Sequence, residues 1–361
     1  MKIGLIGNPA NRRVTLNREA VSEAGLQCQI YAWHDFPAWL GDIASCDLIK
    51  IESAGEDDHV QMQQIALGDG PVSSDKPIIE YGELAFLSQA YRGFCRQLEA
   101  LEMNGLHFFN PPADIKTMFD KWACHKRFDL AGVPRPRSFL APSNVDEFFE
   151  SVNQTESGRL FLKPLHGSSA SGVLAFRWQG KKQQIITPLE IHRSADGVVR
   201  FFNSLRIRSY LELGDIKEIL RHLLPHGMIA EQWLRKVHYK NKNVDARLVV
   251  IGGEACHFIA RKNRHPMTNL HLGSERVTEV QFASAFGQSA VNVCRDAAEQ
   301  AAACFPDSLY CGVDILLTPD LNPVVLEVNA FGDLLPNVMY KGKSTYTAIM
   351  QSAIKNACNF I

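Results

Sequence analysis

Several features that give an immediate functional assignment are missing from this sequence. Its 361 residues include nine cysteines but no Cys-x-x-Cys pair, which argues against zinc ribbons and thioredoxin-like redox sites. No apolar run approaches the roughly 18 residues of a membrane-spanning helix, and the first residues predict a short strand rather than a signal peptide. We therefore expect a protein of the reducing cytoplasm with no membrane partner.

An excess of either charge is also missing. Lysine and arginine total 38 against 39 aspartate and glutamate residues, which gives a formal net charge of −1. Nucleic-acid-binding domains usually carry a basic excess, so no nucleic-acid partner is expected. The 46% hydrophobic and 21% charged composition is that of a globular protein, and the length fits two or three α/β units.

The standard glycine-rich nucleotide loops are absent. Gly4-Leu5-Ile6-Gly7 lacks the third glycine of a dinucleotide fingerprint, and no Gly-x-x-x-x-Gly-Lys-Ser/Thr sequence opens a helix. Instead, a strand at residues 160–164 leads into the small-residue segment His166-Gly-Ser-Ser-Ala-Ser-Gly172. Backbone N–H groups of such a loop can bind phosphate, and Lys163 adds a charge beside it. A mobile turn with no ligand is the alternative.

The order of predicted elements indicates more than one domain. Strands, among them residues 48–51 and 107–109, alternate with helices up to the breaker Asn110-Pro111-Pro112, as in an open α/β domain. Beyond it we predict a helix over residues 113–130, ended at Gly132, a strand at residues 138–140, and a long interruption over 177–227 that contains a helix capped by Asp215. The interruption carries Arg193, Arg200, Arg206 and Arg208. These arginines form either a solvated face or a contact surface for an acidic substrate.

Residues 313–329 are the most informative segment, because their alternation predicts a β-hairpin. One face should be wholly apolar and packed on a core: Val313, Ile315, Leu317, Val324, Leu326 and Val328. On the other face Asp314 should lie opposite Glu327, with Asn329 next along and Leu316 opposite Val325. Two carboxylates about 5 Å apart repel by roughly 3 kcal/mol at an effective dielectric constant of about 20. A Mg²⁺ ion would offset that repulsion, and a solvated hairpin end is the alternative.

Taken in order, these segments resemble the ATP-grasp superfamily over roughly residues 110–340. The most similar groups are D-alanine:D-alanine ligase, glutathione synthetase and the ribosomal-protein glutamyl ligase. The motifs that carry the resemblance are Asp120-Lys121 before Ala131-Gly132-Val133-Pro134, Lys163-Pro164, Glu231-Gln232-Trp233-Leu234, Asp245-Ala246-Arg247, Arg261 with Thr268-Asn-Leu-His-Leu-Gly273, and Glu327-Val328-Asn329.

The resemblance implies an α/β protein of the ATP-grasp fold with three parts. Residues 1–112 would form an N-terminal open α/β domain on the substrate side. Residues 113–230 would form a small α+β subdomain with the Gly/Ser lid loop and the arginine-rich insertion, and residues 231–361 a large α+β subdomain with the Mg²⁺ site. The two subdomains would enclose ATP.

The resemblance also implies the site residues. The expected ATP-binding residues are Lys121, Lys163, Gly167, Ser168, Ser169, Ser171, Gly172, Glu231, Gln232, Trp233, Leu234, His238 and Arg261. Asp314, Glu327 and Asn329 would bind Mg²⁺, or Mn²⁺ in its place, and Arg261, Asn269 and Arg247 would be catalytic. His238 stands where relatives have a ribose-binding carboxylate, so the ribose contact stays open. The segment after Asn329 lacks the proline of the family loop, which leaves the acceptor side open as well.

The implied activity is that of a carboxylate–amine ligase that forms an acylphosphate with ATP and releases ADP and phosphate. Its substrates would be small-molecule or peptide carboxylates and amines, and a homodimer fits the expectation. Two alternatives remain: a phosphotransferase of the same fold, and an ATP-binding regulator without turnover.

Overall fold

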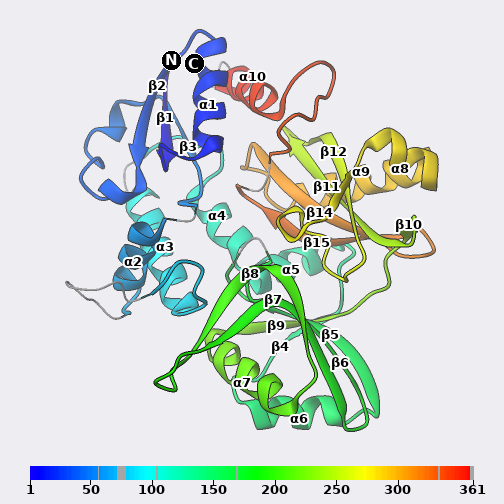
Figure 1. Ribbon diagram of the computed structural model, residues 1–361. Helices are drawn as coiled ribbons and strands as arrows, with labels where there is room; N and C mark the ends of the chain where they lie inside the picture. The colour runs from blue at the N-terminus through cyan, green and yellow to red at the C-terminus, as the bar shows by residue number, and fades with distance from the viewer. Residues whose placement is uncertain (56, 71–78, 103–104, 168–169, 332–333, 358–361) are drawn as a thin grey trace.

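The computed structural model describes residues 1–55, 57–70, 79–102, 105–167, 170–331 and 334–357. Within these residues the strands form one three-stranded and two six-stranded sheets. The three sheets occupy separate parts of the molecule, and the two larger ones face each other across its middle (Figure 1). This arrangement agrees with the predicted fold class of one open α/β domain and two α+β subdomains.

The N-terminal sheet is parallel, with strand order β2-β1-β3. Its strands are β1 (Lys2–Gly7), β2 (Gln27–Ala32) and β3 (Leu48–Ile51), and the helices of this part are α1 (Arg12–Glu23), α2 (Asp58–Leu67) and α3 (Leu87–Glu102), with the 3-10 turns η1 (Trp33–Asp35) and η2 (Ile43–Ser45). Ile3, Leu5 and Ile6 of the central strand are at most 1% exposed, as expected where both faces of a parallel sheet are covered.

The small subdomain is built on an antiparallel sheet with strand order β4-β9-β5-β6-β7-β8. Its strands are β4 (Ser138–Leu140), β5 (Ser157–Pro164), β6 (Leu174–Gln179), β7 (Lys182–Arg193), β8 (Val199–Tyr210) and β9 (Met228–Gln232). Helices α6 (Val145–Asn153) and α7 (Leu213–Leu223), followed by the turn η3 (Leu224–His226), lie on the face away from the centre of the molecule (Figure 1). Phe148 and Leu220 of these helices are fully buried in the core on that face, which leaves the other face free to line a site.

The large subdomain has the sheet order β13-β12-β11-β14-β15, with β10 paired to β11. Its strands are β10 (His238–Tyr239), β11 (Lys242–Ile251), β12 (Glu254–Asn263), β13 (Glu275–Val277), β14 (Tyr310–Leu317) and β15 (Pro323–Asn329); its other elements are η4 (Leu270–Leu272), α8 (Glu279–Phe286) and α9 (Gln288–Ala302). Helix α9 packs across β11, β12, β14 and β15. The last helix, α10 (Thr345–Ala357), lies against α1 of the N-terminal domain (Figure 1).

Four local predictions were wrong. The helix predicted over 113–130 is two helices, α4 (Pro112–Phe119) and α5 (Lys121–Ala131), because the extended residue Asp120 caps α5 by accepting from the backbone N–H groups of Trp122 and Ala123. The strand expected at residues 107–109 is a single bridge between Ile49 and Phe108.

The other two wrong predictions concern residues 177–227. Most of this interruption is the long hairpin β7–β8, and the N-cap of α7 is Glu212 rather than Asp215. Three of the four arginines there form ion pairs within the chain: Arg193 with Asp215 and Glu218, Arg200 with Glu80, and Arg208 with Glu190. The predicted domain boundaries stay predictions. The second boundary, after residue 230, falls within β9, which ends at Gln232.

A buried ion pair joins the N-terminal domain to the large subdomain. Lys50 of β3 and Glu52, the first residue after that strand, each have a side chain 1% exposed and form an ion pair. Lys50 Nζ also donates to Tyr310 Oη at the start of β14 (2.6 Å), and Asn17 Nδ2 donates to Glu52 Oε1 (2.9 Å). The first residue of the strand that later carries Asp314 is therefore tied to the parallel sheet.

Replacing Glu52 by alanine should leave Lys50 as a buried charge with no anionic partner. We expect the free energy of unfolding to fall by about 3–5 kcal/mol, measured from the midpoint of urea denaturation. The matched control is Glu80→Ala, which removes the exposed ion pair with Arg200 and should cost less than about 1 kcal/mol. Equal midpoints for the two variants would contradict this account of the interface.

Candidate active site

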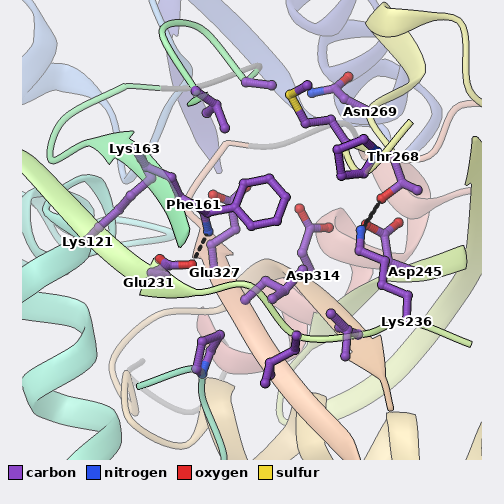
Figure 2. A pocket seen from close by; sticks show the side chains of 18 of the residues that line it. Lys121, Phe161, Lys163, Glu231, Lys236, Asp245, Thr268, Asn269, Asp314 and Glu327 are labelled. Atoms are coloured by element: carbon purple, nitrogen blue, oxygen red, sulfur yellow. Dashed lines mark hydrogen bonds and ion pairs between the residues drawn. The ribbon is translucent and has the colours of Figure 1, made fainter. Parts of the chain in front are cut away.

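A cleft lies between the two six-stranded sheets and encloses about 900 Å³, counted with its open mouth, a size typical of ligand pockets. Its lining comes from α5, β5, β9, β11, β12, β14 and β15 and from the loops that follow β5 and β12. Charged side chains from both sheets point into it (Figure 2). Segments more than a hundred residues apart in sequence therefore form one polar site.

Most of the site residues predicted from the sequence line this cleft. They are Lys121, Lys163, Gly167, Ser171, Glu231, Gln232, Leu234, Arg261, Asn269, Asp314 and Glu327. Five others do not line it: Gly172, Trp233, His238, Arg247 and Asn329. Ser168 and Ser169 lie outside the described residues.

Two of the residues outside the lining, His238 and Trp233, were predicted to bind the nucleotide. His238 is exposed on the short strand β10, and the Trp233 ring packs against Phe161 and Arg159. The cleft lining also includes residues that were not predicted as site residues. Among them are Lys236, Asp245 and Thr268, and the apolar side chains Phe161, Val173, Met267, Leu316 and Leu326. Lys236 lies in an irregular connection between β9 and β10, where no periodicity indicates the direction of a side chain.

The hairpin register confirms that Asp314 lies opposite Glu327. The same register pairs Gly312 with Asn329, as predicted. The Asn329 amide donates to Glu327 Oε1 (3.2 Å). A methyl group on Gly312 would lie 2.8 Å from Arg247 Nη1, so the missing side chain at Gly312 makes room for the Arg247 guanidinium.

Beyond Asp314 the predicted register was wrong. A bulge shifts the pairing so that Leu316 lies opposite Val324 and Ile315 opposite Val325. Val325 is therefore buried in the core, whereas Leu326 lines the cleft together with Leu316. The extra residue of a bulge reverses the faces of all residues beyond it. As a result, an apolar wall lies directly beside the two carboxylates.

Two arginines share the carboxylate of Asp314. Arg247 bonds it through Nε and Nη2, the latter at 3.0 Å, and Arg261 Nη2 lies 3.1 Å from Oδ1. Burial alone would raise the pKa of Asp314, but the two guanidinium groups outweigh it and hold that pKa well below its ordinary value. Asp314 is therefore ionised at neutral pH. Within the described residues, no lysine or arginine forms an ion pair with Glu327.

The donor set of Asp314, Glu327 and Asn329 fits a hard divalent cation. It consists of two facing carboxylates and an amide, and Mg²⁺ prefers such oxygen ligands together with phosphate oxygens and water. No group of three or more His, Cys, Asp or Glu side chains suited to a metal occurs in the described part of the chain. An ion held here would therefore take its remaining ligands from a bound phosphate and from water.

Lys163, on the opposite sheet, forms an ion pair with a carboxylate of that same sheet. Lys163 Nζ lies 2.6 Å from Glu231 Oε2, a pair visible beside Glu327 in Figure 2. Burial tends to lower the pKa of Lys163, but Glu231 and Glu327 outweigh it and raise that pKa. Behind the pair, burial and the nearby lysine lower the pKa of His125 to about 3. Lys163 is therefore charged and His125 neutral at physiological pH.

A second lysine on the same side is Lys121, the first residue of α5. Its Nζ donates to the backbone carbonyl of Gly167 (2.9 Å) at the root of the Gly/Ser loop. Burial lowers the pKa of Lys121, and Glu327 opposes that shift. Two lysines thus face the carboxylates of the hairpin across the cleft, a distribution suited to a ligand with both phosphate groups and a metal ion.

Comparison with known proteins rests on structure, because no protein-family model matches the sequence and a search of curated proteins found no match. Three solved structures illustrate the likeness. D-cycloserine synthetase DcsG is 13% identical, with 99% of this chain and 100% of that chain covered and a TM-score of 0.60. The ATP-grasp ligase PsnB complexed with minimal precursor, Mg and ADP is 16% identical (99% and 98% covered, TM-score 0.53). D-alanine–D-alanine ligase from Bacillus anthracis complexed with ATP is 13% identical (100% and 98%, TM-score 0.52).

These likenesses extend over the whole chain, so the protein has the ATP-grasp fold. The three structures are named as a synthetase and two ligases. The resemblance stated from the sequence motifs is confirmed at the level of the fold.

The bulged register predicts different effects of the same substitution at two neighbouring residues. Val325→Glu would bury an unpaired charge in the core and should unfold the large subdomain, because such burial costs several kcal/mol. Leu326→Glu places the same charge in the open cleft and should leave the thermal melting curve within a few degrees of wild type. Circular dichroism melts of both variants test this, and the reverse order of stabilities would refute the bulged register.

Proposed function

We propose that this protein is an ATP-dependent ligase that joins a carboxylate to an amine. The carboxylate attacks the γ-phosphate of ATP to give an acylphosphate and ADP, and the amine then displaces phosphate to form an amide. The observation that carries the proposal is the facing pair Asp314 and Glu327, set across a cleft from Lys121 and Lys163. Relatives of the same fold are named as ligases and synthetases, and some are complexed with ATP or with Mg and ADP.

The nucleotide would lie with its base between the apolar walls of the cleft. Phe161, from β5, and Leu316 and Leu326, from the hairpin, line opposite sides near Glu231 and Gln232. Apolar walls suit an adenine ring, and the backbone carbonyl of Gln232 and the backbone of Leu234 can read its edge, since the Gln232 N–H already donates to the Arg137 carbonyl. His238 is exposed on β10, which disfavours it as the ribose contact.

The chain's cations would neutralise the triphosphate. Lys121 and Lys163 reach the cleft from the small-subdomain side and Arg261 from β12. Phosphoryl transfer depends mainly on such positioning and charge stabilisation. Asp314, Glu327 and Asn329 would hold a Mg²⁺ ion, which would supply positive charge to stabilise the phosphates. Use of Mn²⁺ in its place stays a prediction.

Arg247 lies outside the cleft lining, and its proposed role at the acyl group rests on one unsatisfied donor. Its Nη1 is buried and has no hydrogen-bond partner among the described residues, while Nε and Nη2 are occupied by Asp314. An unpaired buried N–H is costly unless a ligand satisfies it. Arg247, Arg261 and Asn269 would stabilise the oxyanion of the tetrahedral adduct, and the loop from Gly167 to Gly172 would keep water from the acylphosphate.

The substrates are a carboxylate and an amine from small molecules or a peptide. PsnB is complexed with its precursor peptide PsnA2, and macrocyclase MdnC is bound with precursor peptide MdnA, which supports including peptides. Within the described residues, no helix is both long and apolar enough to cross a bilayer. Cytoplasmic location and a homodimer stay predictions.

A panel of carboxylates and amines, assayed for ADP release from Mg-ATP, tests the proposal directly. ADP release that requires both a carboxylate and an amine supports the ligase. A phosphorylated product without an amine would instead show a phosphotransferase, and nucleotide binding without turnover on any substrate pair would show a regulator. Either of these results overturns the proposal.

Glu327→Ala should lower ADP release by about 100-fold or more, because a metal ligand is lost at the transferring phosphate, while the circular dichroism spectrum stays unchanged. Glu254→Ala is the matched control, since Glu254 lies on β12 of the same sheet at the surface. Near-normal ADP release from Glu327→Ala would remove the basis for the metal assignment.

Lys163→Ala should raise the Kd for ADP by about tenfold, because a charge–phosphate contact is lost and Glu231 is left buried without its partner. Isothermal titration calorimetry measures this directly. The control is Lys182→Ala, an exposed lysine on β7 of the same sheet, which should bind ADP as wild type does. An unchanged Kd for Lys163→Ala counts against its role.

A further inference from the structure

One carboxylate beside the cleft, Asp245, connects three separate segments of the large subdomain. Asp245 lies on β11 opposite Arg261 of β12 and is 4% exposed. Its Oδ1 accepts from Arg261 Nε at 2.9 Å, and its Oδ2 accepts from Lys236 Nζ at 3.0 Å and from the hydroxyl of Thr268. The donors come from β12, from the connection between β9 and β10, and from the loop after β12.

Lys236 completes a hydrogen-bonded network with Asp245 and Thr268. Its Nζ also donates to Thr268 Oγ1 at 2.6 Å, and its side chain is 9% exposed (Figure 2). Burial lowers the pKa of Lys236 and Asp245 opposes that shift. Each of the three side chains Lys236, Asp245 and Thr268 contacts the other two. Such a hydrogen-bonded network is rigid, because breaking any one of its hydrogen bonds leaves a buried polar group unpaired.

The loop that carries Thr268 is held from both sides. Met267 and Leu272 are buried in a small apolar cluster with Val173 of the small subdomain, a contact that has no directional preference. Thr268 makes the directional contacts, to Asp245 and Lys236. The next residue, Asn269, lines the cleft and caps η4 by accepting from the His271 N–H at 2.9 Å.

We infer that Asp245 is a positioning residue of this cleft: it holds the Arg261 guanidinium directly and, through Thr268, the loop that presents Asn269. This inference deepens the proposed function, since Arg261 and Asn269 act on the phosphoryl and acyl groups there. Asp245 itself acts through these two residues. Lys236 and Arg261 balance its charge, so the carboxylate can stay buried next to the cleft without a ligand.

Thr268→Val removes the hydroxyl and keeps the shape of the side chain. Hydrogen–deuterium exchange of the amides of Leu272, Gly273 and Ser274, which bond to the carbonyls of Asn269 and Leu270, should become about tenfold faster. Thr268→Ser restores the hydroxyl and should exchange as wild type does. Exchange in Thr268→Val equal to wild type, or equally fast exchange in Thr268→Ser, overturns the inference.

Asp245→Asn and the double variant Asp245→Asn/Thr268→Val complete a double-mutant cycle with Thr268→Val. Because Thr268 acts through Asp245, the double variant should exchange no faster than Asp245→Asn alone; additive effects would show that Thr268 acts independently and overturn the inference.

A second experiment distinguishes a role of Thr268 in positioning from a role in nucleotide binding. In Thr268→Val the Kd for ADP should stay within about threefold of wild type, while ADP release with an active substrate pair falls about tenfold. A tenfold loss of ADP affinity instead would show a binding role and overturn the positioning role. If the wild-type protein neither binds nor turns over nucleotide, the proposed function fails, and the exchange measurements, made without nucleotide, still decide the inference.

Discussion

The burial of opposite charges on one face of the large sheet is the constraint on which the rest of this structure depends. Arg247, Asp314, Arg261, Asp245 and Lys236 form a continuous series in which positive and negative groups alternate. Each is less than a tenth exposed, so none can be removed without leaving another charge desolvated. Among the described residues, Glu327 stands beside this series without an ion pair and accepts from the Asn329 amide, which makes it the natural point for a cation to join.

The fold brings the two halves of this charge distribution together. Both six-stranded sheets pack helices on their outer faces, α6 and α7 on one and α9 on the other, and turn their remaining faces toward the cleft. The short connection after β9 carries Leu234 and Lys236 from one sheet to the other. The N-terminal domain is fixed to the same sheet through Lys50, Glu52 and Tyr310, so the site is part of a frame that extends through the whole chain.

The sequence predicted those features that follow from local pattern. Asp314 and Glu327 were placed opposite each other by alternation alone, since the two residues lie on the same side of the bulge as Gly312 and Asn329. The strands at Leu48–Ile51 and Ser138–Leu140 and the helix stop at Gly132, where φ is 67°, were likewise found from pattern. The reversal of Val325 and Leu326 was missed, because a bulge depends on how the partner strand and core accept an extra residue.

What the sequence alone determined is the identity and order of the chemical groups: a lysine before a Gly/Ser loop, the segment Glu231-Gln232-Trp233-Leu234, and a hairpin with two acids and an amide. These are local properties, because side-chain direction in a strand follows from its period of two. Only the tertiary structure decided which groups share the cleft. It excluded His238 and included Lys236, because the connection between β9 and β10 has no period and its side chains point where the packing of two sheets directs them.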